Sequence, residues 1–448
     1  MVDHNEPGEG LPRNSDGLMA QGGAEVSDVL TVATSLNAKT ISELLRNRNF
    51  VPLWIGQLVS YLGDQFMLIA VLATINKLAG GGSFYIVLLA VSLAAPQILF
   101  GLIGGVLVDK LDRKWTMIIT DVVRAIAMFS MLLVAGDVAR IWIFYPAIFA
   151  IGTSQMLFYP ARASAMPALV SKRNLAGANA LLEAGFVVAL IFGSGMAGLL
   201  VENLGEDFAF SFNGFAFLFS ALMILIINVP PRRVHHTKTS GSSYGQVWRE
   251  LREGLVYIWR TRSMRYIMGL SVIVAAGLGA VIALVLDYLT LELQVGAQGF
   301  GVVIGILGIG IVIGGILIQR LSKFLPTNRL VALAIFLQGV AVGAFVFHPP
   351  FGLVLFLTAL IGFSLIVARA VLSTLTQAIP PEEYRGRVQS AYNLIFTAPL
   401  TLAIGVATLL VTLLNREIVM GGFGLGLMLT AYLAARLLQG VDEAIYGS

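Results

Sequence analysis

The sequence predicts an all-α membrane protein of twelve transmembrane helices, arranged in two six-helix bundles with both termini in the cytoplasm. Three observations lead to this prediction: long apolar runs, a one-sided distribution of basic residues, and a weak internal repeat. Of the 448 residues, 57% are hydrophobic and only 12% are charged, whereas about a quarter of the residues in soluble proteins are charged. The 48 glycines also fit packed membrane helices, because glycine lets helix backbones approach closely.

Apolar runs long enough to cross a bilayer follow one another along the chain, since a membrane helix needs about 20 apolar residues. The connections are short except at 230–264, which divides the runs six and six. We therefore expect a disordered cytoplasmic tail (1–39), two bundles (40–229 and 265–440), a cytoplasmic linker (230–264) and a second cytoplasmic tail (441–448). The expected spans are 51–76, 84–108, 115–135, 141–161, 176–201, 208–229, 265–290, 299–320, 327–347, 351–372, 387–413 and 418–439.

Apolar residues recur at helical spacing in the second part of the linker. Charged residues lie between them, so this segment is predicted to form an amphipathic helix at the membrane surface that leads into the seventh span. A simple solubilising linker is the alternative. The apolar positions are Tyr244, Val247, Trp248, Leu251 and Leu255.

Lysine and arginine residues give the orientation. With the N-terminus in the cytoplasm, only Lys77, Arg140 and Arg416 of the 29 basic residues fall on the outside. Cytoplasmic loops of membrane proteins carry such an excess of positive charge. The same distribution explains the net charge of +4 without a nucleic-acid partner, and it favours contact with anionic lipid.

The two halves of the chain resemble each other at three places with nearly constant spacing. GGVLVDKL at 104–111 corresponds to GGILIQRL at 314–321, and the Ala-Arg-Ala around Arg162 corresponds to that around Arg369. A basic pair also precedes the first and the seventh span. Two bundles related by an axis along the membrane normal give rise to this pattern.

The stretch GVLVDKLDRK at 105–114, between the second and third spans, resembles the signature loop of the major facilitator superfamily. Other stretches look like its bacterial drug and siderophore exporters: SYLGD at 60–64, DVVR at 121–124 and YPARASAMP at 159–167. Ser194 stands where these exporters carry proline in the fifth span, and the fourth span has no arginine before Arg162. The resemblance implies a transporter in the bacterial cytoplasmic membrane.

Two carboxylates are candidates for binding protons or a cationic solute. Asp64 lies mid-span in 51–76, and Glu183 lies one turn after Asn179 in the fifth span. Placing a carboxylate in the bilayer centre costs roughly 2.5–3.5 kcal/mol, so such a residue is functional by default. Protonation changes the relative energy of inward-open and outward-open states. A structural hydrogen bond or ion pair is the alternative.

Two further groups of polar residues complete the predicted site. Gln389 and Asn393 form a polar stripe on the eleventh span, which either contacts solute or joins helices. Charged residues near the cytoplasmic ends are predicted to form a gate that opens as the bundles rock, with lipid-phosphate anchoring as the alternative. The gate residues are Asp109, Arg113, Asp121, Arg124, Arg162, Arg369, Arg385 and Arg387.

Several classes of function are excluded by the sequence. The chain has no cysteine and four histidines, all outside the apolar runs, so no metal site and no cofactor are expected. A Walker loop is absent, which argues against ATP as the driving force. No enzyme motif is present, and we do not expect an enzyme.

These observations predict a monomeric secondary transporter that exports a small amphiphilic molecule by alternating access. Protons are the expected coupling ion, and solute, protons and membrane lipid are the expected partners. An uptake symporter or a lysophospholipid flippase on the same fold stays open as an alternative. A membrane sensor or assembly partner that transports nothing is the alternative from another class.

Overall fold

A computed structural model describes residues 38–79, 83–100, 111–134, 137–230 and 244–439. Within these residues every regular element is helical, and ten helices are long and apolar enough to cross a membrane. The expected second span is described only as far as Phe100, and the eleventh contributes the shorter apolar helix Ala398–Val411. A multi-pass helical membrane protein is therefore confirmed, whereas twelve spans and cytoplasmic termini stay predictions.

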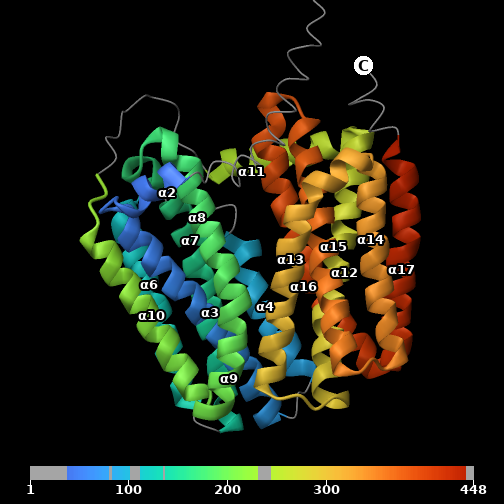
Figure 1. The fold of residues 1–448 in the computed structure, drawn as a ribbon, viewed down its shortest axis with the longest axis horizontal. Coiled ribbons are helices and arrows are strands. Elements are labelled where there is room, and N and C mark those ends of the chain that lie inside the picture. Colours follow the sequence, from blue (N-terminus) through green and yellow to red (C-terminus); the bar gives the residue numbers. More distant parts are fainter. Residues whose placement is uncertain (1–37, 80–82, 101–110, 135–136, 231–243, 440–448) are drawn as a thin grey trace, which may run out of the picture.

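The helices form two groups that lie side by side (Figure 1). In the first group the most extensive contacts join α3 with α10 and α6 with both α7 and α10. This group also includes two consecutive helices, α8 and α9, that are joined by a π-helical turn, η4. Its members are α3 (Phe50–Ala79), α4 (Ser83–Phe100), α6 (Arg113–Met131), α7 (Phe144–Leu169), α8 (Leu175–Val188), η4 (Ala189–Gly193), α9 (Ser194–Leu204) and α10 (Glu206–Ile226).

The second group contains six long helices, and its most extensive contacts join α14 with α17, α12 with α16 and α13 with α15. Proline directly precedes three of these helices, at Pro326, Pro350 and Pro381. Proline fixes φ and lacks an N–H, so it fits a helix start, where no intrahelical partner is lost. Membrane helices also tolerate proline in their interior, as at Pro399 in α16. The helices are α12 (Arg262–Asp287), α13 (Ala297–Phe324), α14 (Thr327–Gly343), α15 (Phe351–Ala378), α16 (Glu382–Leu413) and α17 (Arg416–Leu437).

Two helices at one end of the molecule lie outside this pattern (Figure 1). The short helix α2 (Ala38–Leu45) inserts Leu44 into the base of the first group, and Asn174 donates a hydrogen bond of 2.9 Å to Glu43. The linker helix α11 (Tyr244–Arg260) packs on α16, where Tyr257 stacks on Tyr384 with ring centroids 4.9 Å apart. The predicted amphipathic helix is thus held by the second group.

The two groups contact each other mainly through α9 and η4 against α13, and through α4 against α16. The α9–α13 contact, which we call the glycine seam, brings the backbones together at Gly198 and Gly301. A Cβ atom at Gly198 would lie 2.6 Å from the carbonyl oxygen of Ala297, and one at Gly301 would overlap that of Ser194. Membrane helices use small residues for such close approaches. Helix α9 lies at the end of the molecule that is remote from α2 and α11 (Figure 1).

Candidate functional site

One face of α3 carries the polar residues of the first group. Gln57, Ser60, Tyr61 and Asp64 recur at three- and four-residue spacing, so they share a helix face. Gln57, Ser60 and Tyr61 are buried. The Asp64 side chain is partly buried, and its Oδ1 atom is fully buried without a hydrogen-bond partner among the described residues. Asp64, which the sequence analysis selected as a mid-membrane carboxylate, therefore lies on a largely buried polar face of α3.

Arg162 binds this face from α7. Its Nη1 donates hydrogen bonds to Gln57 Oε1 at 2.9 Å and to Tyr61 Oη at 2.5 Å, and its guanidinium lies 5.2 Å from the Tyr159 ring centroid. We expected the fourth span to end at residue 161, but α7 continues to Leu169. The extra turns place Arg162 inside the first group, where it joins α7 to α3.

Asp121 and Arg124 form a buried ion pair three residues apart on α6. Asp121 is 0% exposed and Arg124 2%. The guanidinium carbon lies over two aromatic rings, 4.5 Å from the centroids of Phe158 on α7 and Phe217 on α10. Asp64 lies within electrostatic range of both charged groups, and Tyr159 lies within electrostatic range of Asp64, Arg124 and Arg162. The interior of the first group therefore holds two acidic and two basic side chains.

Helix α10 completes this interior with uncharged polar groups. Asn213 and Ser220 are both 0% exposed, and Asn213 is a polar neighbour of Asp64. A Cβ atom at Gly63 would overlap the Asn213 side-chain amide, so α3 and α10 are in close contact here. The sequence analysis did not select Asn213 or Ser220. Asn213 and Ser220 are seven residues apart, and this spacing on one helix face is the signal that would have found them.

The other predicted site residues lie apart from this interior. Asn179 and Glu183 are exposed on α8. The Phe186 ring meets the Tyr61 ring edge-on at 5.5 Å, and Tyr61 lies within electrostatic range of both Glu183 and Asp64. Tyr61 therefore lies between the two predicted carboxylates. The side chains of Gln389 and Asn393 on α16, and of Arg385, are outside the described residues, as is the whole of Asp109.

The remaining predicted gate residues lie in separate places. Arg387 forms an ion pair of 2.9 Å with Glu253 of the linker helix and lies 5.5 Å from the Tyr384 ring centroid. Arg369 is exposed on α15, with its guanidinium 5.0 Å from the Phe396 ring centroid. Arg113 is half-buried at the start of α6. In the described part of the chain, the contacts of these residues do not join them to Asp121, Arg124 or Arg162.

Residues next to Arg113 define the start of α6 and its contact with α10. Asp112 caps the helix by accepting a hydrogen bond of 2.9 Å from the Trp115 amide. Lys114 donates two hydrogen bonds of 2.8 Å to the carbonyl oxygens of Leu225 and Ile227 at the end of α10. A cation suits this position because the last carbonyls of a helix are unpaired and partially negative.

Lys114→Met should therefore destabilise the first group without changing any residue of the interior. Loss of the two charge-assisted hydrogen bonds is expected to lower the free energy of unfolding by about 1 kcal/mol, because the site is partly exposed to solvent. Unfolding of the purified protein in mixed micelles would measure the change. Lys323→Met, at the exposed end of α13, is the matched control. Equal stability of both variants would contradict the capping role.

A hydrogen bond between the two groups lies at one end of the glycine seam. The Glu202 carboxylate on α9 accepts a hydrogen bond of 3.2 Å from the Gln298 backbone amide, in the first turn of α13. The amides in the first turn of a helix have no partner within that helix, and the helix dipole favours a negative charge there. Glu202 of one group thus caps a helix of the other group.

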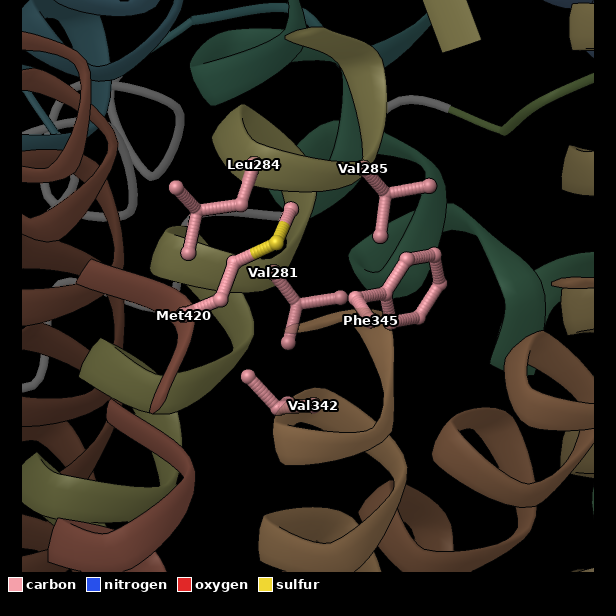
Figure 2. Close-up of a pocket in the computed structure, with 6 residues that line it drawn as sticks. All are labelled: Val281, Leu284, Val285, Val342, Phe345 and Met420. Carbon is pink, nitrogen blue, oxygen red and sulfur yellow. The ribbon is translucent and has the colours of Figure 1, made fainter. Parts of the chain in front are cut away.

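Figure 2 shows a pocket in the second group, between α12, α17 and the end of α14 with η6 (Ala344–Phe347). Its walls are entirely apolar, and it has no room for a water molecule. It cannot hold a charged or polar solute, and we assign it to packing. The lining residues are Val281, Leu284, Val285, Val342, Phe345 and Met420.

Two groups of apolar helices, close contacts between the groups at one end, and buried charges within one of them define a multi-pass membrane transporter. A model described as Major Facilitator Superfamily matches residues 53–406, and the chain belongs to this superfamily.

Several curated relatives of low identity are bacterial proteins named for export or efflux, and others are named only as uncharacterised transporters. A Bacillus subtilis protein named for bacilysin export, BacE, is 24% identical over 82% of this chain and 88% of its own. The multidrug efflux pump Tap of Mycolicibacterium fortuitum is 27% identical over 65% of this chain and 72% of its own. Macrolide efflux protein A of Streptococcus pyogenes is 23% identical over 80% of this chain and 88% of its own.

Solved structures of other transporters share the fold. The nucleoside transporter NupG superimposes with a TM-score of 0.67 at 14% identity, covering 89% of this chain and 99% of its own. A POT family transporter crystallised with 5-aminolevulinic acid gives a TM-score of 0.69 at 10% identity, covering 89% and 97%. At these identities the likeness extends to the fold alone.

Proposed function

We propose that this chain is a secondary transporter that exports a small amphiphilic molecule from bacteria, driven by the proton gradient. The observation that carries the proposal is the partly buried Asp64 side chain in the middle of the first span, whose Oδ1 atom is fully buried and which lies within electrostatic range of Arg124 and Asp121. A carboxylate at this depth takes up and releases a proton at low cost only if water reaches it during the cycle. The relatives named for efflux support the outward direction.

Alternating access is the mechanism that this arrangement favours. The glycine seam joins the two groups at the end remote from α2 and α11, whereas Asn179 and Glu183 are exposed in the other half of the fifth span. With both termini in the cytoplasm, as the basic residues predict, the seam would close the outer face and the site would open inward. Rocking of the two groups about α4–α16 and α9–α13 would then expose the site to the outside.

The Glu202 bond offers a first test of this motion. Glu202→Ala should weaken the closed seam by about 0.5–1 kcal/mol, the lower part of the range for a helix cap, since the side chain is exposed. Spin labels at Leu204→Cys and Gln298→Cys, in a chain without other cysteines, would report the distance between α9 and α13. We expect the long-distance population to rise. Unchanged distances would show that the cap does not hold the seam.

Transport assays in everted membrane vesicles test the proposed direction. Vesicles containing the chain should accumulate ethidium or radiolabelled erythromycin when energised, and a protonophore should abolish the accumulation. Accumulation in right-side-out vesicles would instead indicate uptake. Movement of labelled lysophospholipid between leaflets, without flux of the other probes, would indicate a flippase. A sensor or assembly partner predicts no flux in any of these assays.

A further inference from the structure

We propose that Arg162 binds an oxyanion of the transported solute, and that this solute is therefore an amphiphile that carries a carboxylate. The aromatic side chains of Tyr61, Tyr159 and Phe186 would contact its apolar part. That a solute bound here is exported rests on the proposed function, whereas the binding site itself does not.

The Arg162 guanidinium has hydrogen-bond donors that the described residues do not use. A guanidinium carries five N–H groups, and Nη1 donates to Gln57 Oε1 and Tyr61 Oη. The N–H groups on Nε and Nη2 have no hydrogen-bond partner among the described residues, and the side chain is partly exposed. These two nitrogens form an edge of the guanidinium that can bind a carboxylate through two parallel hydrogen bonds.

Gln57 adds a further donor beside Arg162. Its Oε1 accepts a hydrogen bond from Arg162, so its amide nitrogen is a donor, and this nitrogen is buried without a hydrogen-bond partner among the described residues. Native interiors pair nearly all such atoms, and an exception indicates a functional role or an additional bound group. An ionised carboxylate has only acceptors, so it complements this donor-rich end of the polar face.

The acids of the first group do not occupy the free edge of Arg162, whose described contacts are with neutral side chains. Asp121 forms its ion pair with Arg124. The charged groups that act on Asp64 are Arg124 and Asp121, and Glu183 is exposed on α8. In the described part of the chain, Arg162 therefore has a positive charge with no ion-pair partner.

Aromatic rings extend this site from the guanidinium to the surface of the first group. The Tyr159 ring centroid lies 5.2 Å from the Arg162 guanidinium, and the Phe186 ring meets the Tyr61 ring edge-on at 5.5 Å. Phe186 is 41% exposed, so a molecule that contacts its ring lies close to the residue that Arg162 binds. Aromatic rings supply a large apolar contact area, and the site as a whole suits an amphiphile with an oxyanion at one end.

The second group repeats part of this chemistry. Arg369 corresponds to Arg162 in the internal repeat, and it is exposed with its guanidinium 5.0 Å from the Phe396 ring centroid. Both groups thus present an arginine beside an aromatic ring at corresponding positions, which favours an oxyanion on the solute. An inside-negative membrane potential also drives an anion outward, in the direction of export.

Two probes that differ only in charge test this site. N-dansyl-phenylalanine has a carboxylate, and N-dansyl-phenylalaninamide has a neutral amide in its place. Dansyl fluorescence would measure their binding to the full chain in phosphatidylcholine nanodiscs, with the signal of empty nanodiscs subtracted. The wild type should bind the carboxylate probe at least about tenfold more tightly, as expected for hydrogen bonds between charged groups.

Two variants remove the binding of the carboxylate in different ways. Arg162→Gln removes the positive charge, whereas Gln57→Glu keeps Arg162 and places a carboxylate of the protein beside it. Both variants should lose the preference for the carboxylate probe and keep an affinity for the amide probe close to the wild-type value. Gln57→Glu decides the question even if Arg162→Gln does not fold. Arg173→Gln, which removes an exposed charge from the same group, is the control and should keep the wild-type preference.

Equal binding of both probes by the wild type would overturn the proposal, even if ethidium export is observed. An unchanged preference in Arg162→Gln or Gln57→Glu would overturn it too. So would a preference that disappears in phosphatidylglycerol nanodiscs, since a lipid phosphate would then occupy Arg162. If the preference is as expected but energised everted vesicles do not accumulate the carboxylate probe, the site stands and the proposed export fails.

Discussion

Replacement of Asp64 by asparagine is expected to reduce proton-driven solute accumulation to the level of vesicles without the protein. The amide has nearly the shape of the carboxyl, so packing against α10 is retained, but it cannot bind or release a proton near neutral pH. Energised everted vesicles with ethidium or erythromycin measure the effect. Downhill movement of the same solute should continue, since binding and rocking do not require the proton itself.

Asp207→Asn serves as the matched control for this experiment, because it removes an exposed carboxylate from the same group of helices. Its accumulation should equal that of the wild type. Wild-type accumulation by Asp64→Asn would show that the proton enters elsewhere. Glu183, which is exposed on α8 and lies within electrostatic range of Tyr61, would then be the next candidate.

Gly301→Val is expected to block transport by preventing the glycine seam from closing. A Cβ atom at this position overlaps the Ser194 carbonyl oxygen, and the Gly198 Cα atom would lie 3.1 Å away. Overpacking typically costs about 1–3 kcal/mol, which corresponds to about a 5- to 150-fold shift between two conformations. Most molecules should then have an open seam, and the solute flux should fall by a similar factor.

Spin labels at Leu204→Cys and Gln298→Cys would report this shift as a longer distance between α9 and α13. Gly195→Val is the matched control, since it lies one residue from Ser194 on the same helix and a Cβ atom there meets nothing within 4 Å. Normal flux and an unchanged distance in Gly301→Val would mean that the seam does not take part in gating.

Much of the fold could be predicted from the sequence because membrane helices depend on apolar length. Helices α3 and α17 begin within two residues of the spans expected at 51–76 and 418–439. The errors lie where local chemistry outweighs hydropathy. Helix α7 continues past residue 161 to Leu169, and Gln57 and Tyr61 accept hydrogen bonds from the Arg162 guanidinium within the protein. The π turn η4 in the fifth span has no hydropathy signal.

The candidate site could be predicted only in part from the sequence. A mid-span carboxylate is costly wherever it lies, so Asp64 could be selected from its position alone. Asp121 and Arg124 were selected as gate residues because charged residues near the cytoplasmic ends are predicted to form a gate. Their burial depends on Phe158 and Phe217 from two other helices, and only tertiary packing brings these rings together. The sequence analysis did not select Glu202, because its hydrogen-bond partner is a backbone amide of another helix and has no side-chain signal.

Proton movement driven by a solute gradient, in proteoliposomes that contain only the purified chain, is the most direct test of proton-coupled alternating access. With no imposed pH gradient, an outwardly directed ethidium gradient should drive protons inward, as detected by a trapped pH-sensitive dye, and Asp64→Asn should move none. Solute flux without any proton movement in the wild type would contradict the mechanism, and so would undiminished proton movement in Asp64→Asn.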